Sequence, residues 1–192
     1  MSTTTVLLCG VGGQGTILAA DLLARAALAA GLDVKVSEIH GMAQRGGSVT
    51  TTVRFGENVD SMIADLGDSD FVVSFETTEA LRNLPYLKKG GHMLVSDETM
   101  TPMTVLIGAQ SMPEHPQTTL ESHGALFIPA LQIAQEAGTA KASNVALLGA
   151  LSVFLDFDQA IWEEVIAQRV PAKTIETNLK AFEQGRAFAQ AK

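Results

Sequence analysis

The sequence predicts an open, mostly parallel α/β sheet flanked by helices, with a helical C-terminal part. Three observations lead to this fold class. A short apolar run, Val6–Cys9, is followed directly by a glycine-rich stretch and an alanine- and leucine-rich helix. Hydrophobic residues make up 46% of the chain but aromatic residues only 5%, which is typical of a parallel sheet of aliphatic side chains buried between helices. From Pro129 onwards the pattern is helical almost to the end.

The N-terminal third is expected to form a strand, a helix and further strands. The apolar run indicates a central strand at residues 5–9, and the helix over Gln14–Ala30 ends at Gly31. Residues 33–39 alternate well enough for a strand, parallel to the first if the helix is the crossover. Apolar and polar residues alternate over 48–55, which indicates a strand with one wetter face. Residues 59–63 are expected to pair back onto that strand.

The rest of the chain continues the same alternation and then turns helical. Residues 71–75 form another apolar strand, followed by a helix over 76–84 that Pro85 ends. Gly90-Gly91 leads into a strand at 92–96, and 125–128 is the last strand of the sheet. Within the polar segment 97–123 we expect one strand, Thr104–Ile107. Four helices complete the chain, over residues 130–137, 144–154, 159–168 and 172–189. We therefore expect one domain over 1–192, with a sheet core of about 4–128 and a helical part of about 129–190.

Composition excludes several classes of function. The net charge of −8 argues against non-specific nucleic-acid binding, because phosphate backbones need a basic face. The single cysteine, Cys9, excludes internal disulfides, and we expect it to be a small buried hydrophobe. The first residues lack the pattern of a signal peptide, and no apolar run reaches the ~18 residues of a membrane span. We expect a cytoplasmic protein with no membrane partner.

The glycine-rich stretch is the strongest candidate for a ligand site, and it reads Gly10-Val11-Gly12-Gly13-Gln14-Gly15. Its spacing matches the dinucleotide fingerprint, with a strand before it and a helix after it. The first N–H groups of that helix have no partner and favour an anion, so the pattern predicts a diphosphate pocket. Glu38 lies near the end of the next strand, which is the position of the carboxylate that binds a ribose in dinucleotide-binding folds. A purely structural glycine turn is the alternative.

A second candidate is the loop segment Gln44-Arg45-Gly46-Gly47, beyond the carboxyl end of strand 33–39. Open α/β sheets bind ligands at this edge, and the guanidinium group of Arg45 suits a phosphate or a carboxylate. An exposed ion pair with a neighbouring chain is equally compatible with the pattern. Asn144, at the start of a helix, is a candidate either for a simple N-cap or for a ligand contact.

Four motifs occur in the order of one known family: the glycine stretch, the loop Ile39-His40-Gly41-Met42-Ala43-Gln44-Arg45-Gly46-Gly47-Ser48-Val49, the segment Asn144–Ala150 and the segment Asn178–Gly185. The chain resembles the gamma-type subunit of 2-oxoacid:ferredoxin oxidoreductases over almost its whole length. The sequence of the loop is most similar to that of indolepyruvate-type members. Relatives that act on pyruvate or 2-oxoglutarate tend to have Tyr-Gly and an acidic residue in this loop. At Ser61-Met62 the chain departs from the family pattern, in which Ser-Pro is expected. Residues 100–123 contain no motif typical of the family.

The resemblance implies a role in oxidative decarboxylation. The complete enzyme would take an aryl 2-oxoacid, coenzyme A and oxidised ferredoxin, and yield an acyl-CoA, carbon dioxide and reduced ferredoxin. Thiamine diphosphate, Mg²⁺ and [4Fe–4S] clusters would lie on a larger alpha-type partner subunit. This chain has one cysteine, whereas each cluster needs about four thiolates. The sequence most similar to a thiamine diphosphate motif in this chain is Gly67-Asp68-Ser69. We expect an isolated chain to bind none of these groups and to be inactive, and to work in a hetero-oligomer, with self-association left open.

We expect this chain to help bind coenzyme A. We assign no catalytic residue and no metal-binding residue to it. The residues assigned to coenzyme A binding are Gly10, Gly12, Gly13, Gln14, Gly15, Arg45, Gly46, Gly47 and Asn144. The subunit interface is expected on strand 48–55 and the C-terminal helices. The alternatives are a gamma subunit acting on pyruvate or 2-oxoglutarate, a stand-alone NAD(P) or FAD oxidoreductase of Rossmann type, and a regulatory module for an adenine nucleotide.

Overall fold

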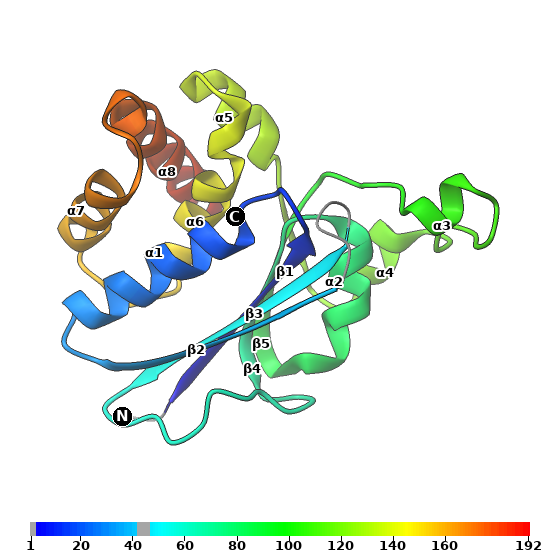
Figure 1. Cartoon of the computed structure of the whole chain (residues 1–192), viewed down its shortest axis with the longest axis horizontal. Coiled ribbons are helices and arrows are strands. Elements are labelled where there is room, and N and C mark those ends of the chain that lie inside the picture. Colours follow the sequence, from blue (N-terminus) through cyan, green and yellow to red (C-terminus); the bar gives the residue numbers. More distant parts are fainter. Residues whose placement is uncertain (1–2, 42–46) are drawn as a thin grey trace.

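A computed structural model describes residues 3–41 and 47–192, and these contain one sheet of six strands with helices on both faces (Figure 1). The strands lie in the order β2-β3-β1-β4-β5-β6. The β1–β4, β4–β5 and β5–β6 pairs are parallel, and β3 is antiparallel to both β1 and β2. The strand bounds are β1 (Thr4–Val11), β2 (Asp33–His40), β3 (Ser48–Gly56), β4 (Ser69–Ser74), β5 (Leu87–Ser96) and β6 (Leu126–Ile128). The open, mostly parallel sheet is therefore confirmed.

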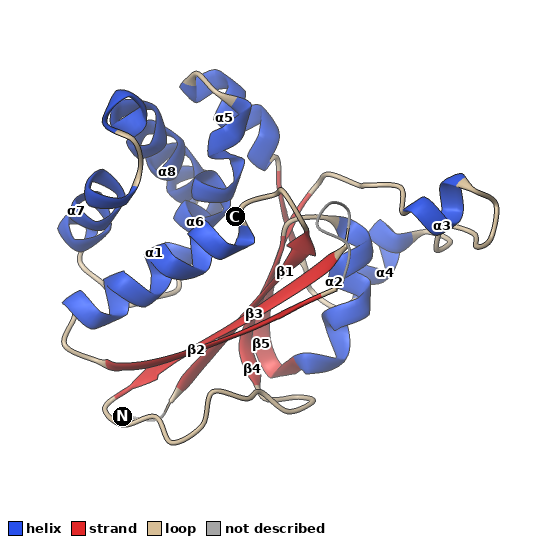
Figure 2. Cartoon of the chain, in the orientation of Figure 1, coloured by secondary structure: helices blue, strands red, loops and turns tan. Residues whose placement is uncertain are grey.

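The helices form two unequal layers on this sheet, as Figure 2 shows. α1 and the helices from α5 to α8 cover one face, while α2 and α4 lie on the other. Side chains along β1 alternate between the layers, since Val6 and Leu8 belong to the larger core and Leu7 and Cys9 to the smaller. The bounds are α1 (Thr16–Ala29), α2 (Thr77–Asn83), α3 (Met103–Leu106), α4 (Pro116–Ser122), α5 (Ala130–Ala137), α6 (Ser143–Ser152), α7 (Gln159–Arg169) and α8 (Ile175–Gln190). No helix in the described part of the chain is long and apolar enough to cross a bilayer.

The position of β2 differs from the simplest reading of the sequence. β2 does run parallel to β1, but β3 lies between them and pairs with both. The connection from β2 to β3 spans only residues 41–47. That is too short for a parallel crossover, which needs a dozen or more residues, so β3 returns antiparallel. β2 becomes an edge strand.

Two expected strands are wrong. Residues 59–63 form no strand: Val59 is buried, but its N–H donates to the Oδ2 atom of Asp33 (2.9 Å) instead of a neighbouring strand. Thr104–Ile107 falls on α3, where Pro102 sits at the N-cap of a short exposed helix. The helix α4 was not predicted. Its sequence is mainly polar, and only Leu120 is buried.

Strand β5 also starts earlier than expected, at Leu87, and continues through the Gly90-Gly91 pair. Its register against β4 shifts between Ser69 and Phe71. A Cβ atom at Gly91 would lie 2.7 Å from the carbonyl oxygen of Asp70, so this irregular crossing requires glycine.

The C-terminal helices α6 and α8 pack with their backbones in direct contact. A Cβ atom at Gly149 would meet the carbonyl of Phe182, and one at Gly185 would meet the carbonyl of Ala146. Neither obstacle is the flexible end of a side chain, so the helices themselves would have to separate. Both glycines therefore set how closely α6 and α8 pack together within the larger helical layer.

We predict that Gly185→Ala destabilises the protein by about 1–3 kcal/mol or more. In an ordinary exposed helix the same change would stabilise the protein by about 1 kcal/mol. The sign of the change in the free energy of unfolding therefore tests whether α6 and α8 are in close contact at this position. Urea unfolding measures the difference, with the exposed neighbour Glu183→Ala as the control. A variant as stable as the wild type would show that the α6–α8 contact is looser than described.

Candidate functional site

The turn between β1 and α1 forms the rim of the candidate site. Gly13 and Gly15 have φ angles of 105° and 82°, which disfavour residues with a side chain. Gly15 is the N-cap of α1, and its carbonyl accepts the N–H of Ala19 (3.1 Å). Among the described residues, the N–H groups of Gly13, Gly15 and Thr16 have no hydrogen-bond acceptor. These N–H groups therefore favour the binding of an anion at the turn.

The side chain of Gln14 closes the turn from within. Its Oε1 atom accepts the N–H of Val11 (2.9 Å), and its Nε2 atom donates to the carbonyl of Phe75 (3.1 Å). A Cβ atom at Gly10 would lie 2.7 Å from that Oε1 atom and 2.9 Å from the Cβ atom of Phe75. The side chain of Gln14, predicted as a ligand contact, thus ties the turn to the end of β4. Gly10 is needed to make room for it.

Asn144 fixes the other side of the turn from a distant part of the chain. Its Nδ2 atom donates to the carbonyl of Gly15 (3.2 Å), and its Oδ1 atom accepts the N–H of Val145 (2.9 Å). Asn144 is buried, and a Cβ atom at Gly15 would collide with it. It lies inside α6 and is not the N-cap, which is Ala142. Asn144 therefore holds the N-terminus of α1 against the C-terminal helices.

The stem of the arginine loop lies beside the same turn. The N–H of Gly12 donates to the carbonyl of Gly47, and the N–H of Gly41 donates to the carbonyl of Ser48, both at 2.9 Å. The predicted site residues Arg45 and Gly46 lie outside the described residues. The structure thus brings Gly47 to the glycine turn from the end of that loop.

A cavity of about 460 Å³ opens next to this rim, and two of its buried lining residues were missed by the sequence analysis. Glu76 caps α2 by accepting the N–H of Thr78 (3.0 Å) and that of Glu79. Glu79 accepts the hydroxyl of Ser48 (2.5 Å) and pairs with Arg82 (3.3 Å). Two glutamates three residues apart, directly after an apolar strand, were the available signal. Burial raises the pKa of Glu79, although the Ser48 hydrogen bond and Arg82 oppose the shift.

Other candidates lie away from the rim or are chemically inert. Glu38 is exposed on β2, and the whole of β3 separates it from the glycine turn. Cys9 is fully buried, and burial raises the pKa of its thiol to about 12, so it is a packing residue as expected. Asn178 donates to the carbonyl of Thr174 (2.8 Å) within its own stretch of chain. The strand expected at the interface, 48–55, is mostly buried between β1 and β2. The strand therefore offers little surface to a partner, and an interface there stays a prediction.

Comparison with known proteins gives consistent results for the whole chain. Residues 5–188 match the family model described as pyruvate ferredoxin/flavodoxin oxidoreductase. The indolepyruvate oxidoreductase subunit IorB of Thermococcus kodakarensis is 43% identical, over 96% of this chain and 95% of that protein. The gamma subunit of a keto/oxoacid ferredoxin oxidoreductase from Geobacter sulfurreducens superimposes with a TM-score of 0.74 and 24% identity, covering 98% of this chain and 99% of that one.

A longer polypeptide contains the same fold. A 2-oxoglutarate:ferredoxin oxidoreductase from Magnetococcus marinus, solved with 2-oxoglutarate, coenzyme A and succinyl-CoA bound, gives a TM-score of 0.75 at 24% identity. The match covers all of this chain but only 32% of that one. At this identity the likeness concerns the fold alone.

We predict that Asn144→Ala destabilises the protein by about 1 kcal/mol or more, because the half-buried carbonyl of Gly15 loses one of its two donors and keeps only the N–H of Ala19. Asn178→Ala is the matched control, since it removes the same atoms from a hydrogen bond made within one turn of helix. Thermal unfolding of the two variants compares them. Equal losses would mean that the bond to Gly15 contributes nothing beyond the buried volume.

We predict a pH signature for Glu79. Because its folded pKa is raised, the native state binds the proton more tightly, and unfolding releases it. Its contribution to stability is therefore present below the ordinary pKa of 4.5 and is lost as the pH rises above it. The advantage of wild type over Glu79→Gln should shrink from pH 4 towards pH 7, measured by urea unfolding. Exposed Glu183→Gln is the control, and a parallel trend in both variants contradicts the assignment.

Proposed function

The chain belongs to the pyruvate ferredoxin/flavodoxin oxidoreductase family, and we propose that it is the smaller subunit of a cytoplasmic enzyme that oxidises an aryl 2-oxoacid such as indolepyruvate. The observation that carries this proposal is the identity of 43% with an indolepyruvate oxidoreductase subunit, over nearly the full length of both chains. The complete reaction would consume coenzyme A and oxidised ferredoxin and yield an acyl-CoA, carbon dioxide and reduced ferredoxin.

The glycine rim is proposed to bind the ADP portion of coenzyme A at the junction with the partner subunit. The N–H groups of Gly13, Gly15 and Thr16 offer donors to a phosphate. Arg45, which precedes Gly47 in the adjoining loop, would add a guanidinium group. The neighbouring cavity contains two carboxylates, Glu76 and Glu79, against a single cation. Phosphates are therefore assigned to the turn and not to that cavity.

The redox groups are assigned to the larger partner subunit, because the residues of this chain do not fit them. An iron–sulfur cluster needs about four thiolates, and the one cysteine is buried with a strongly raised pKa. Asp68, in the only wording close to a thiamine diphosphate motif, forms an ion pair with Arg54 (3.4 Å). The partner would thus supply the thiamine diphosphate with its Mg²⁺ and the clusters that pass electrons to ferredoxin.

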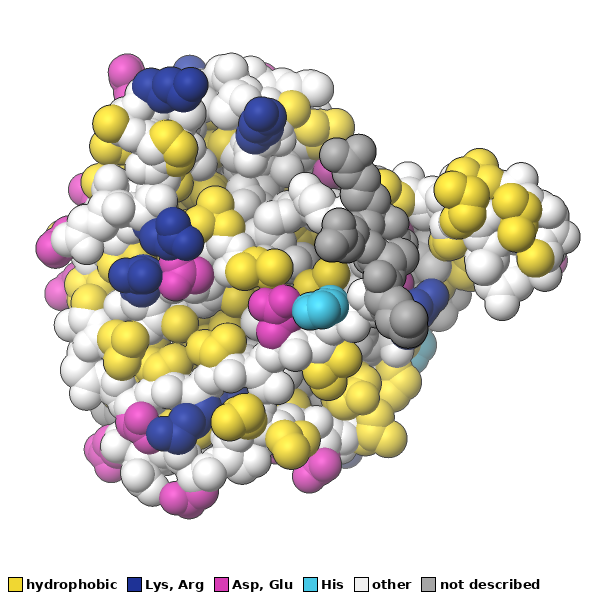
Figure 3. Space-filling model, in the orientation of Figure 1, with side chains coloured by type: hydrophobic (Ala, Val, Ile, Leu, Met, Phe, Trp, Pro, Cys, Tyr) yellow, Lys and Arg dark blue, Asp and Glu magenta, His cyan; other side chains and the backbone are white. Residues whose placement is uncertain are grey.

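A projecting arm gives this chain a second surface for the partner. The arm contains α3, and Figure 3 shows hydrophobic side chains gathered on it. Met103, Leu106 and Ile107 are each at least 65% exposed. Apolar residues at this density are typical of the centre of an interface. We propose that the arm, and not strand β3, docks onto the larger subunit.

We predict that Arg45→Ala raises the KM for coenzyme A about tenfold or more in the assembled enzyme, the loss expected for one charge-assisted contact with a phosphate. The KM for the oxoacid should stay close to that of the wild type. Steady-state kinetics of the reconstituted complex measures both values. Arg25→Ala is the control, because that arginine pairs with Asp21 on the exposed side of α1.

Two results would count against this role. If Arg45→Ala changes both KM values equally while the complex still assembles, the rim does not select coenzyme A. If the purified chain alone oxidises a 2-oxoacid, or binds NADH, NADPH or FAD stoichiometrically, the assignment of the redox groups to a partner is wrong.

A further inference from the structure

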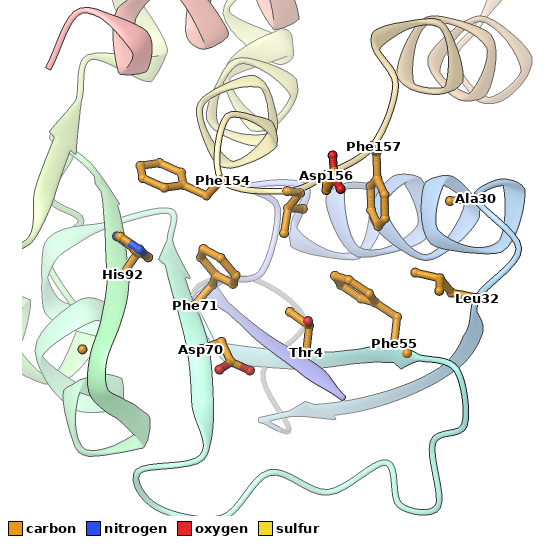
Figure 4. Close-up of a pocket in the computed structure, with 13 residues that line it drawn as sticks. Thr4, Ala30, Leu32, Phe55, Asp70, Phe71, His92, Phe154, Asp156 and Phe157 are labelled. Atoms are coloured by element: carbon orange, nitrogen blue, oxygen red, sulfur yellow. The ribbon is translucent and has the colours of Figure 1, made fainter. Parts of the chain in front are cut away.

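A second cavity lies at the opposite edge of the sheet from the glycine rim. It has a volume of about 560 Å³, within the range of small-molecule sites. Its walls are the amino ends of β1, β4 and β5, the end of β3, and the connection between α6 and α7 (Figure 4). Thr4 in this cavity and Val11 at the rim occupy opposite ends of β1, about 23 Å apart at the usual rise per residue. The proposed function uses none of the lining residues.

Phenylalanine side chains dominate the lining. The chain has eight phenylalanines, and four of them (Phe55, Phe71, Phe154 and Phe157) line this one cavity. Figure 4 shows Phe55 and Phe71 rising from the sheet towards the connection that carries Phe157. The ring centroids of Phe55 and Phe157 are 5.4 Å apart. In a chain so poor in aromatic residues, this concentration favours a flat aromatic ligand.

The aromatic wall continues to both sides of the cavity. His92 stacks on Phe71, with centroids 5.6 Å apart, and lies 4.6 Å from Phe154. On the inner side, the ring of Phe157 lies 5.8 Å from that of Trp162, which is fully buried. The rings near the core are therefore held in place by packing, and the wall is formed before any ligand arrives.

The charges around the cavity are negative. Asp70 and Asp156 line it, and the lining contains no Lys or Arg among the residues that the structure describes. Asp70 already accepts the N–H of Thr5 (2.9 Å) and the ammonium group of Lys88 (2.8 Å). Asp156 is exposed and has no ion-pair partner in the described part of the chain. A carboxylate without a partner beside an aromatic wall disfavours an anion and favours a cation.

We propose that this cavity is a binding site for a planar aromatic amine, with its ring against half-buried Phe154 and Phe157, over the buried rings of Phe55 and Phe71, and its ammonium group beside Asp156. This cavity lies apart from the rim proposed for coenzyme A, and its negative charge would repel the phosphates of coenzyme A. Because the two sites are separate, one can be occupied without the other. A free aromatic amine or an aromatic amino-acid derivative without a net negative charge has the required chemistry.

The test uses two probes with the same ring and opposite charge, 1-naphthylmethylamine and 1-naphthoate. Each is titrated by calorimetry into the assembled two-subunit enzyme, and contact with the protein is followed by saturation-transfer NMR. The amine should bind about tenfold tighter than the carboxylate or better. Equal affinities, or no binding of the amine because the partner covers the cavity, would overturn the proposal.

Variants of this chain locate the binding. Asp156→Lys should weaken binding of the amine about fivefold or more, the scale of one partly exposed charge contact. Asp158→Lys makes the same charge change two residues away, outside the cavity lining, and should leave the affinity as it is. Leu155→Trp places a large side chain in the cavity and should abolish binding, with assembly checked by gel filtration. If both lysine variants behave alike, or if Leu155→Trp still binds the amine, the site lies elsewhere.

Discussion

Two amide side chains hold the glycine turn closed, and the candidate site depends on them. Gln14 bonds to β1 and β4 from inside the turn, and Asn144 bonds to Gly15 across 129 residues of sequence. Because both amides are committed, the donors of the turn that lack an acceptor among the described residues are the N–H groups of Gly13, Gly15 and Thr16. Gly10 and Gly15 are required by the space that Gln14 and Asn144 occupy. Two glycines of the dinucleotide fingerprint are therefore explained by packing, without any dinucleotide.

The reversed strand β3 has consequences for both edges of the sheet. It displaces β2, and with it Glu38, from the side of β1, so the carboxylate that binds ribose in nucleotide-binding folds of this type is not beside the turn. Its first residues bring Gly47 and Ser48 to the carboxyl edge, next to Gly12 and Glu79. Its last residues bring Phe55 to the amino edge. One strand thus contributes to an anion-friendly rim at one end and to an aromatic, negatively charged cavity at the other.

The proposal that this subunit binds and positions without carrying electrons rests on the distribution of its groups. The chain offers backbone donors, apolar contact surface and the two cavities described above, while its single thiol is buried away from solvent. In the longer polypeptide that shares this fold at 24% identity, the matching region covers 32% of the chain. The same module therefore occurs both as a separate chain and as part of a larger one.

The sequence by itself determined the features that depend on neighbouring residues. Strand β1, helix α1 and its end at Gly31, and the four C-terminal helices follow from periodicity and from glycine at positive φ. Only the tertiary structure decided which strand lies beside β1, that Asn144 holds Gly15, that Ser48 meets Glu79, and that Phe55 and Phe71 share one cavity with the Phe154–Phe157 segment. Each of these joins residues far apart in the sequence, and local preferences carry no information about such pairs. Their geometry is fixed when the sheet forms and the helices pack onto it.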